Sequence, residues 1–287
     1  MKPKVLNLSN GLFHSFSARL DTLPDINNHW HYHRELELVY FKRGNGTQFV
    51  GDSVKPFKDG DIVLLGSDLP HFWQFSKKHL KSGGSDAVEI FVIHFNEDFF
   101  GDVLLCLSEF QEIRRLFEFC RHGLQILGKQ KTRVGFLISQ LVPSSGAKRI
   151  SLLIDCLSEI SACKETRKLA TMGFQPDLPQ SSINRLESVY DYTMRNHKKK
   201  IDIGKIAGFA NLRPKSFCRL FKKASGKTYI QFLNEVRIGQ ACQLLIEGKL
   251  SVKEICYESG FVNFTSFHRT FRSLTGTTPL AYQKASD

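Results

Sequence analysis

The amino-acid sequence predicts an α+β protein with an antiparallel β-barrel over residues 1–105, a helical region over 106–172 and an all-helical domain over 183–287. Short apolar or alternating runs separated by glycine turns fill the first region, and such runs are typical of antiparallel strands. Apolar residues then recur at every third or fourth position, as on amphipathic helices. The last region contains one helical pattern twice, which indicates a duplicated supersecondary unit.

In the N-terminal region, four runs have the length and composition of strands: residues 36–41, 47–50, 62–65 and 88–95. Turn residues such as Gly44-Asn45-Gly46 separate them. Many short strands with glycine turns favour an antiparallel barrel or sandwich. His94 lies on a strand face shared with apolar residues, where we expect a satisfied core histidine rather than a ligand.

Imidazoles and carboxylates alternate near the start of this region, at His29, His31, His33, Glu35 and Glu37. Alternate residues of a strand point to the same face. We therefore expect these side chains to lie on one strand and to line one side of it.

Two motifs cover the barrel, written His31-x-His33-x3-Glu37-x6-Gly44 and Pro56-x3-Gly60-Asp61 with Pro70-His71. They resemble the two motifs of the cupin barrel. In metal-binding cupins the matching positions, here His31, His33, Glu37 and His71, face inward and hold a divalent metal. Three imidazoles and one carboxylate would suit Zn, Fe, Ni or Mn. The alternative is that these side chains bond to one another or to an organic ligand near the barrel mouth.

Aromatic residues flank both motifs, at Trp30, Tyr32, Phe72, Trp73 and Phe75. Aromatic walls with a few polar groups suit a carbohydrate or another small polar ligand. The same aromatic residues are equally typical of an ordinary core. We expect a ligand site formed by Trp30, His31, His33, Glu37, His71 and Trp73, with no cofactor required.

Three apolar stripes follow, within residues 104–120, 134–141 and 150–161, and each predicts an amphipathic helix. Short helices with this much apolar surface need a partner. We expect them to pack on the outside of the barrel and against the same helices of a second subunit, which forms a homodimer. Residues 173–182 contain glycine, proline and serine without periodicity and predict a linker, and Ser182 is a candidate cap for the next helix.

The positive charge of the chain is concentrated near its C-terminus. The net charge is +12, and residues 181–287 carry 18 Lys and Arg against 8 Asp and Glu, whereas the other residues carry 22 against 20. Such a field attracts a polyanion, although a solvated basic face is the simpler alternative.

The seven cysteines include no C-x-x-C pair, which suits reduced thiols in a cytosolic protein. No apolar run of signal-peptide length follows the N-terminus, and no window of about 18 apolar residues predicts a membrane span. We therefore expect a cytoplasmic protein without a membrane partner.

The C-terminal repeat predicts two helix-turn-helix units. Ile206 matches Ile255 at a shift of 49 residues, and Arg219 matches Arg269 at a shift of 50. Each copy predicts a short helix, a tight turn and a second helix. Residues 228–245 predict a spacer helix that would hold the two second helices in successive major grooves of DNA.

The second helix of each copy turns its phenylalanines inward and leaves basic and polar residues outside. We expect DNA contacts from Lys215, Ser216, Arg219, Lys222 and Lys223 in the first copy, and from Asn263, Phe264, Thr265, His268, Arg269 and Arg272 in the second. Early residues of such a helix meet base edges, so Lys222, Lys223 and Arg272 are better placed for phosphates. Pro214 suits a first helical turn, and Asn263 is a good N-cap.

Three patterns carry a family resemblance: Arg237-Ile238-x2-Ala241-x2-Leu244-Leu245, Ile255-Cys256-x3-Gly260-Phe261, and Phe267-x-Arg269-x-Phe271-Arg272 with Gly276-x2-Pro279-x2-Tyr282. They resemble the DNA-binding domain of the AraC/XylS family over residues 183–282. With the cupin motifs, the resemblance implies a bacterial transcription regulator that binds double-stranded DNA and senses a small-molecule effector in its barrel. The first copy departs from the family pattern at Arg213 and Cys218, so we expect it to rely more on phosphates than on bases.

The leading hypothesis is a ligand-responsive regulator, activator or repressor, that is not an enzyme and has RNA polymerase as a further candidate partner. One alternative is a metal-dependent cupin enzyme fused to a DNA-binding domain, supported only by His31, His33, Glu37 and His71. Another is a regulator that needs no ligand and uses its barrel as a dimerisation scaffold.

Overall fold

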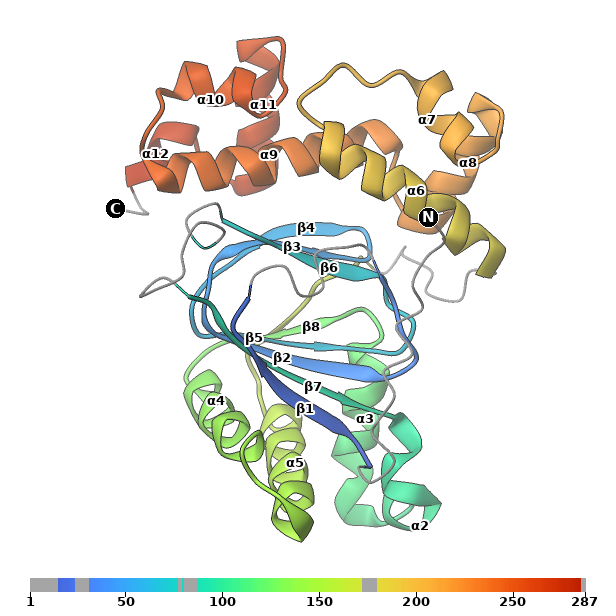
Figure 1. Ribbon diagram of the computed structural model, residues 1–287, viewed down its shortest axis with the longest axis vertical. Helices are drawn as coiled ribbons and strands as arrows, with labels where there is room; N and C mark the ends of the chain where they lie inside the picture. Colours follow the sequence, from blue (N-terminus) through green and yellow to red (C-terminus); the bar gives the residue numbers. More distant parts are fainter. Residues whose placement is uncertain (1–14, 24–30, 77–78, 80–86, 172–179, 285–287) are drawn as a thin grey trace.

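The structure of the protein, a computed structural model, describes residues 15–23, 31–76, 79, 87–171 and 180–284. His29, Trp30 and most of the predicted linker lie outside the described residues. An N-terminal antiparallel β-domain with helices on one face is followed by an all-helical C-terminal domain (Figure 1). The predicted α+β class is therefore confirmed.

Two antiparallel sheets face each other in the β-domain (Figure 1). The larger sheet has the strand order β1-β7-β2-β5-β8-β9, and the smaller has the order β4-β3-β6. The strands are β1 (Ser17–Asp21), β2 (Leu36–Arg43), β3 (Gly46–Val50), β4 (Ser53–Phe57), β5 (Asp61–Leu65), β6 (His71–Phe75), β7 (Glu89–Phe95), β8 (Leu124–Ile126) and β9 (Thr166–Lys168). This arrangement leaves β4 at the edge of the smaller sheet, the position in which a strand tolerates a proline such as Pro56.

The four predicted strands correspond to β2, β3, β5 and β7. Residues 106–172 contain the predicted helices, but this segment also contributes β8 and β9 to the larger sheet, which the helical prediction did not include. These strands are three residues long. Pairing with a neighbouring strand, rather than their own sequence pattern, makes them extended.

Side chains on the two faces of the larger sheet enter different hydrophobic clusters. Leu38 and Ile62 belong to a cluster shared with the helices on the outer face, whereas Val39 and Phe41 belong to a cluster between the two sheets. The helices of this region are the 3-10 helices η1 (Glu97–Phe100) and η2 (Ser108–Phe110) and the α-helices α2 (Gly101–Leu105), α3 (Gln111–Cys120), α4 (Gln130–Leu141) and α5 (Gly146–Ser161). Their apolar stripes therefore pack on the outside of the β-domain, as expected.

The C-terminal domain consists of α6 (Gln180–Asn196), α7 (Ile203–Phe209), α8 (Pro214–Ser225), α9 (Tyr229–Glu247), α10 (Val252–Glu258), α11 (Phe264–Thr275) and α12 (Pro279–Lys284). Helices α7 and α8 form the first helix-turn-helix unit, α10 and α11 form the second, and α9 connects them (Figure 1). Because α6 already begins at Gln180, Ser182 lies inside this helix and the prediction that it caps the helix is wrong.

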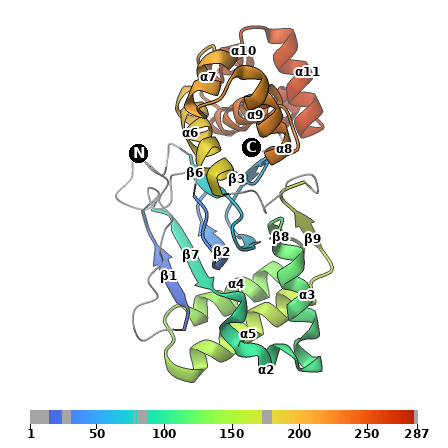
Figure 2. The same ribbon diagram turned by 90° about the vertical axis from the view of Figure 1, so that its right-hand side faces the viewer.

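The helical domain lies on the outer face of the smaller sheet, on the side of the β-domain opposite to α4 and α5 (Figures 1 and 2). Phe49 of β3 and Phe72 of β6 join the hydrophobic cluster of the first helix-turn-helix unit. The cluster of the second unit contains only residues of the helical domain. Among the described residues, no helix combines the length and the apolar character needed to cross a bilayer.

Candidate nucleic-acid interface and buried histidine cluster

Each helix-turn-helix unit joins a 7-residue helix to a 12-residue helix through a tight turn. The turn of the first unit contains Asn211 with a φ angle of +53°, and that of the second contains Gly260 with a φ angle of +95°. The next residue donates its backbone N–H to a carbonyl oxygen of the preceding helix, with an N···O distance of 3.0 Å for Leu212 and 3.1 Å for Phe261. Both turns therefore use the same left-handed geometry, which asparagine and glycine adopt most easily.

The second helices of the two units begin differently. In α8, Pro214 occupies the first turn, and Arg213 at the N-cap makes no side-chain capping bond. In α11, Asn263 Oδ1 accepts a hydrogen bond from the backbone N–H of Ser266 at 2.8 Å. The predictions for Pro214 and Asn263 are confirmed, and the missing cap leaves the N–H groups of α8 open to solvent or to a bound anion.

Most of the predicted DNA-contacting residues lie on the surface. Lys215, Arg219, Lys222, Lys223, Asn263, Phe264, Thr265, Arg269 and Arg272 are exposed, whereas Ser216 and His268 are half-buried. The phenylalanines predicted to turn inward, Phe217 and Phe267, are fully buried. Among the described residues, none of the exposed cations of α8 and α11 forms an ion pair, so their charge is free to meet a polyanion.

His268 differs from the other predicted DNA-contacting residues. Its ring lies 4.5 Å from that of Phe264 in an edge-on contact. Its Nε2 atom is buried and has no hydrogen-bond partner among the described residues. The imidazole therefore supports Phe264, and its Nε2 atom can reach a base only if the side chain rotates.

Helix α9 fixes the two units relative to each other. It is buried along most of its length, against both units and the smaller sheet. Arg237 on α9 donates hydrogen bonds to the carbonyl oxygens of His197, at 2.8 Å, and Lys199, at 3.1 Å, in the loop after α6. Gly260 in the turn of the second unit packs on the same loop. A side chain on α9 thus ties the loop of the first unit to the turn of the second.

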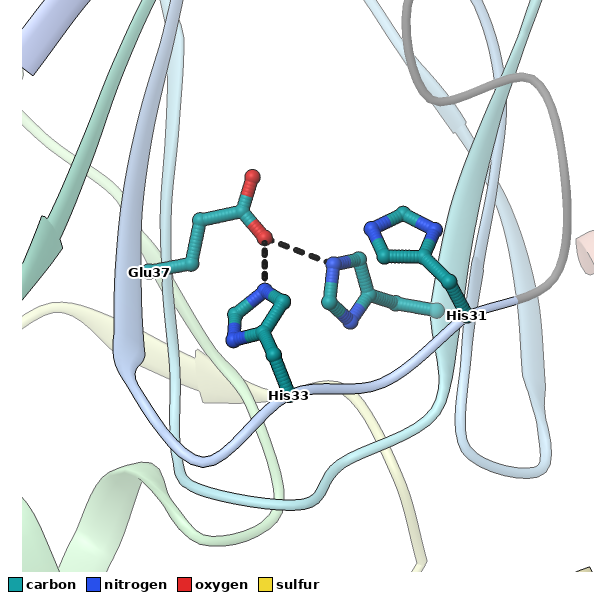
Figure 3. Close-up of side chains that lie close together, drawn as sticks. His31, His33 and Glu37 are labelled. Atoms are coloured by element: carbon teal, nitrogen blue, oxygen red, sulfur yellow. Dashed lines mark hydrogen bonds and ion pairs between the residues drawn. The ribbon is translucent and has the colours of Figure 1, made fainter. Parts of the chain in front are cut away.

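The buried histidine cluster surrounds the carboxylate of Glu37 on β2 (Figure 3). Glu37 Oε2 lies 3.1 Å from His33 Nε2 and 2.6 Å from His71 Nε2. The rings of His31 and His71 are 4.3 Å apart. His94 Nε2 lies 3.7 Å from Glu37 Oε1, and its Nδ1 atom lies 3.2 Å from Arg19. The predicted quartet is therefore brought together, and His94 extends it.

The cluster is not built from one strand, and the expectation of a single alternating strand is wrong. His31 and His33 precede β2, and His31 pairs with His71 of the smaller sheet through two backbone hydrogen bonds of 3.2 and 2.9 Å. His94 stands directly opposite Glu37 in the pairing of β7 with β2. The sequence pattern does not show that register and therefore does not place His94 beside the carboxylate.

The charges of the cluster depend on one another. Burial alone would raise the pKa of Glu37, but the positive charges of His71 and His94 and hydrogen bonds from His33 and His71 hold it well below its usual range. Burial opposes protonation of His33, yet the hydrogen bond with Glu37 raises its pKa. Burial lowers the pKa of His94. The cluster therefore contains a buried carboxylate that stays ionised because the neighbouring imidazoles outweigh the effect of its burial.

The donor set fits a divalent metal. The ligand atoms of His31, His33, Glu37 and His71 all lie within 4.8 Å of one another. The Nδ1 atoms of His33 and His71 donate to the carbonyl oxygens of Glu35, at 2.9 Å, and Leu69, at 2.8 Å. Such bonds fix the ring orientation and direct Nε2 toward the centre. Zn–N bonds of about 2.0–2.1 Å place neighbouring donors roughly 3.4 Å apart, so small movements would bring the four donors around one ion.

The space between the sheets carries two further polar groups. Trp73, one of the predicted ligand residues, is buried, and its Nε1 atom has no partner among the described residues. Gln48 is its direct neighbour in the pairing of β3 with β6, and its Oε1 atom is also buried without a described partner. Gln48 cannot be identified as a site residue from the sequence, because a glutamine on a short strand gives no signal of its own.

Comparison with known proteins agrees with this architecture. Residues 14–168 match the family of the AraC-like ligand binding domain, and residues 206–285 match a helix-turn-helix domain family. An uncharacterised HTH-type transcriptional regulator of Bacillus subtilis, YdeC, is 24% identical over 88% of this chain and 85% of its own length. The probable transcriptional regulator LumQ of Photobacterium leiognathi is 29% identical over 93% of this chain and 96% of its own.

A third relative is the HTH-type transcriptional activator RhaR of Mannheimia succiniciproducens, which is 23% identical over 88% of this chain and 86% of its own length. All three names describe transcriptional regulators, so the alternative of a cupin enzyme is not supported. The ligand-binding family covers more than half of the chain, and the helix-turn-helix family covers both units. The chain therefore belongs to the AraC family of DNA-binding transcription regulators, with an AraC-like ligand-binding domain at its N-terminus.

Proposed function

We propose that this regulator reads an operator with α8 and α11 and responds to a small polar ligand at the histidine cluster, for which a sugar is one candidate. The observation that carries the DNA-reading half is the pair of exposed helices with unpaired cations, held by the buried helix α9. Phe264, Thr265 and Arg269 of α11 would face bases, and His268 would join them if its side chain rotates. Lys215, Ser216 and Arg219 lie at the matching positions of α8, where we expect phosphate contacts to contribute more than base contacts. Lys222, Lys223, Arg272 and the N-terminus of α11 at Asn263 would face phosphates.

The salt dependence of binding tests the phosphate contacts. An operator can be selected from random duplexes, and its affinity can then be followed by fluorescence anisotropy at several salt concentrations. The variant with Lys222→Ala and Lys223→Ala should weaken binding to all sequences alike and reduce the log–log salt slope by about 0.9 for each lost contact. Lys148→Ala, at an exposed position on α5, is the matched control. A loss of affinity for the selected operator alone would contradict this assignment.

The effector site is proposed from the buried polar groups of the β-domain. Glu37 and the histidines offer charged hydrogen-bond partners, and Trp73 and Gln48 offer one donor and one acceptor without a described partner. Unpaired buried polar atoms cost free energy, so a ligand that pairs them gains affinity. The aromatic neighbours of Trp73, such as Phe41 at a ring distance of 5.1 Å, would contact the apolar parts of the ligand.

A bound metal is a second candidate, favoured by the orientation of His33 and His71 toward Glu37. When bound, a divalent ion would supply a positive centre that holds an anionic or hydroxylated ligand. Elemental analysis of protein purified without chelator tests this candidate. About one ion per chain in the wild type, lost in His33→Ala and retained in the control His122→Ala, would support a metal site. Equal metal content in both variants would exclude this cluster as the site.

We also propose a homodimer formed through the helices on the outer face of the larger sheet. Val103, Phe119 and Phe136 are 81%, 54% and 55% exposed on α2, α3 and α4. A second subunit packed on these helices would remove these apolar side chains from water. Light scattering at micromolar concentration should give twice the chain mass, and Phe136→Ser should reduce it. A monomer in the wild type, with or without DNA, would contradict the proposal.

A further inference from the structure

The β-domain contacts the two helix-turn-helix units unequally. Phe49 and Phe72 stack on each other with ring centroids 4.3 Å apart and planes 10° apart, and both belong to the hydrophobic cluster of the first unit. That cluster includes Phe217 and Phe221, the buried phenylalanines of α8. The core of α8 is therefore continuous with the smaller sheet, whereas the core of α11 is not.

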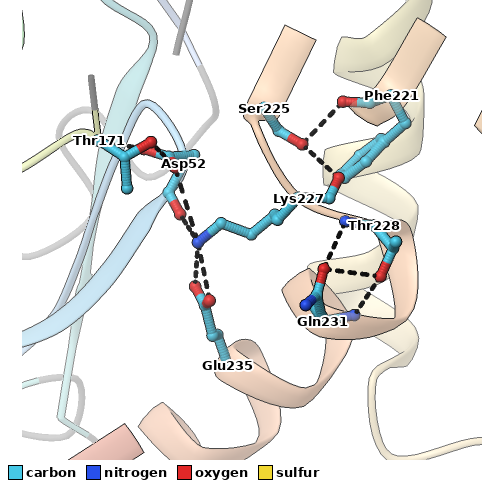
Figure 4. A network of polar contacts seen from close by, with 8 residues as sticks. All are labelled: Asp52, Thr171, Phe221, Ser225, Lys227, Thr228, Gln231 and Glu235. Atoms are coloured by element: carbon cyan, nitrogen blue, oxygen red, sulfur yellow. Dashed lines mark hydrogen bonds and ion pairs between the residues drawn. The ribbon is translucent and has the colours of Figure 1, made fainter. Parts of the chain in front are cut away.

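A buried polar network reinforces this contact (Figure 4). Lys227, between α8 and α9, donates to both oxygens of Glu235 at 2.7 and 2.8 Å and to the backbone carbonyl of Asp52. Its Nζ atom also lies 3.8 Å from the carboxylate of Asp52. Asp52 in turn accepts hydrogen bonds from the backbone N–H and the hydroxyl of Thr171, at 2.8 and 2.7 Å. One cation thus joins both domains.

The burial of this network makes it sensitive to the position of Asp52. The side chains of Lys227, Asp52 and Glu235 are 15%, 1% and 17% exposed. A buried charge that loses its partner destabilises the structure far more than an exposed one does. The hydroxyl of Ser225 also bonds to the carbonyl oxygens of Phe221 and Lys227, so the network is attached to the last turn of α8.

The other end of the network reaches the histidine cluster. Asp52 lies in the turn after β3, and the preceding residue, Gly51, donates its N–H to the carbonyl of Pro70 at 2.7 Å. The residue after Pro70 is His71, which pairs with Val50 across β3 and β6. His71 is therefore connected to the turn that carries Asp52 by its pairing with Val50 and by the hydrogen bond between Gly51 and Pro70.

We propose that Asp52, Lys227 and Glu235 form a latch through which the state of the histidine cluster sets the position of α8, while α11 is not controlled in this way. The proposal rests on the proposed role of the cluster as the effector site. The residue that matches Lys227 at a shift of 50 is Thr277, which cannot form an equivalent ion pair. The latch thus belongs to the first unit alone. An effector would change the position of α8 relative to α11, and with it the simultaneous binding of both helices to one operator.

Hydrogen exchange of the full-length chain tests the latch, with α11 as the internal reference. Lys227→Met keeps the aliphatic stem and removes the charge, and Asp52→Asn removes the partner charge. Each should accelerate exchange at the end of α8 and the start of α9 by about tenfold, because local opening there loses a buried ion pair. Lys249→Met, at an exposed position after α9, is the matched control and should change nothing. Equal acceleration in α11 would overturn the proposal.

A double-mutant cycle tests the connection to the cluster without any bound effector. His71→Gln and, independently, His33→Gln should each accelerate exchange in α8 and leave α11 unchanged. If the cluster acts through the latch, the combination with Lys227→Met should exchange no faster than Lys227→Met alone. The connection would be overturned if the fold-increases in exchange rate from the histidine variant and from Lys227→Met multiply in the double variant. It would also be overturned if neither histidine variant changes exchange in α8. An error in the effector assignment would be seen separately, as absence of ligand or metal binding in the wild type.

Discussion

Helices α8 and α11 have the same length, bury matching phenylalanines and end at glycines with φ angles of +70° and +76°, yet they begin differently and pack against different neighbours. Only α11 has a side-chain cap, and only α8 shares its core with the β-domain. The turn and the C-terminal glycine are set by local backbone geometry, so both copies keep them. The surroundings are not set locally, and there the first unit shares a hydrophobic core with the β-domain.

Removing one core phenylalanine from each unit should produce the largest change in stability and should show most clearly how the two units differ. Phe221→Ala and Phe271→Ala should each lower the free energy of unfolding by about 3–5 kcal/mol, because both side chains are fully buried. The two variants should differ in which elements show faster hydrogen exchange. Phe271→Ala should affect only α9 to α12, whereas Phe221→Ala should also affect β3 and β6 through Phe49. Leu274→Ala, at an exposed position of α11, is the control. Identical exchange maps would remove the distinction between the units.

The turn residues should give the next largest difference. A Cβ atom at Gly260 would overlap the carbonyl oxygen of His197 and approach Lys198 Cα to 2.8 Å, so Gly260→Ala should destabilise the chain by about 3 kcal/mol. Asn211→Ala in the first unit keeps the same left-handed conformation and should cost only about 1 kcal/mol. Gly208→Ala meets no atom within 4 Å inside α7 and should be neutral or stabilising. Urea denaturation measures all three, and equal losses at both turns would contradict this reasoning.

The fold could be predicted where local pattern and tertiary environment agree. The strands β2, β5 and β7 consist largely of apolar residues buried on both faces, and their sequence shows this directly. The strands β8 and β9 exist because a neighbouring strand accepts their hydrogen bonds, and three residues are too few to produce a period. Both HTH units were predictable because their repeat places the same turn and the same buried phenylalanines at a fixed shift.

The sequence predicts which residues form the histidine cluster, but not which strand pairings bring them together. The motif spacing identified His31, His33, Glu37 and His71, which lie together in the structure. That His31 approaches through a bridge to the smaller sheet, and His94 through the pairing of β2 with β7, depends on strand register. Register between distant strands is set by the packing of the whole domain, which one sequence does not display. The contact between Asp52 and Lys227, 175 positions apart, escaped prediction for the same reason.

The loss of base contacts should distinguish the two units by a smaller free energy, and here the second unit should be the more sensitive one. Arg269→Ala should weaken binding to the selected operator by about 1–3 kcal/mol and relax the preference at one base pair, because a bidentate contact to guanine is lost. Arg219→Ala should weaken binding by less than Arg269→Ala and with little change in sequence preference, since the first unit is expected to rely on phosphates. Arg114→Ala on α3 is the control at an exposed position. Anisotropy titrations against a set of single-base operator variants would compare them, and a sharper loss of preference in Arg219→Ala would reverse the roles.

The smallest expected effect concerns the N-caps, and it asks whether the sensor compensates for the cap that α8 lacks. Asn263→Ala should lower the free energy of unfolding by about 1 kcal/mol, because the backbone N–H of Ser266 loses its acceptor. Arg213→Ala should change it by less than about 0.5 kcal/mol, since no capping bond is lost. Arg213→Asn should then stabilise α8 if its first turn is limited by the missing cap. Arg213→Asn could have no effect in the otherwise unchanged chain and yet stabilise α8 in Lys227→Met. The contact with the β-domain would then already hold the helix in place. The difference between the two free energies of unfolding would measure how much α8 depends on that contact.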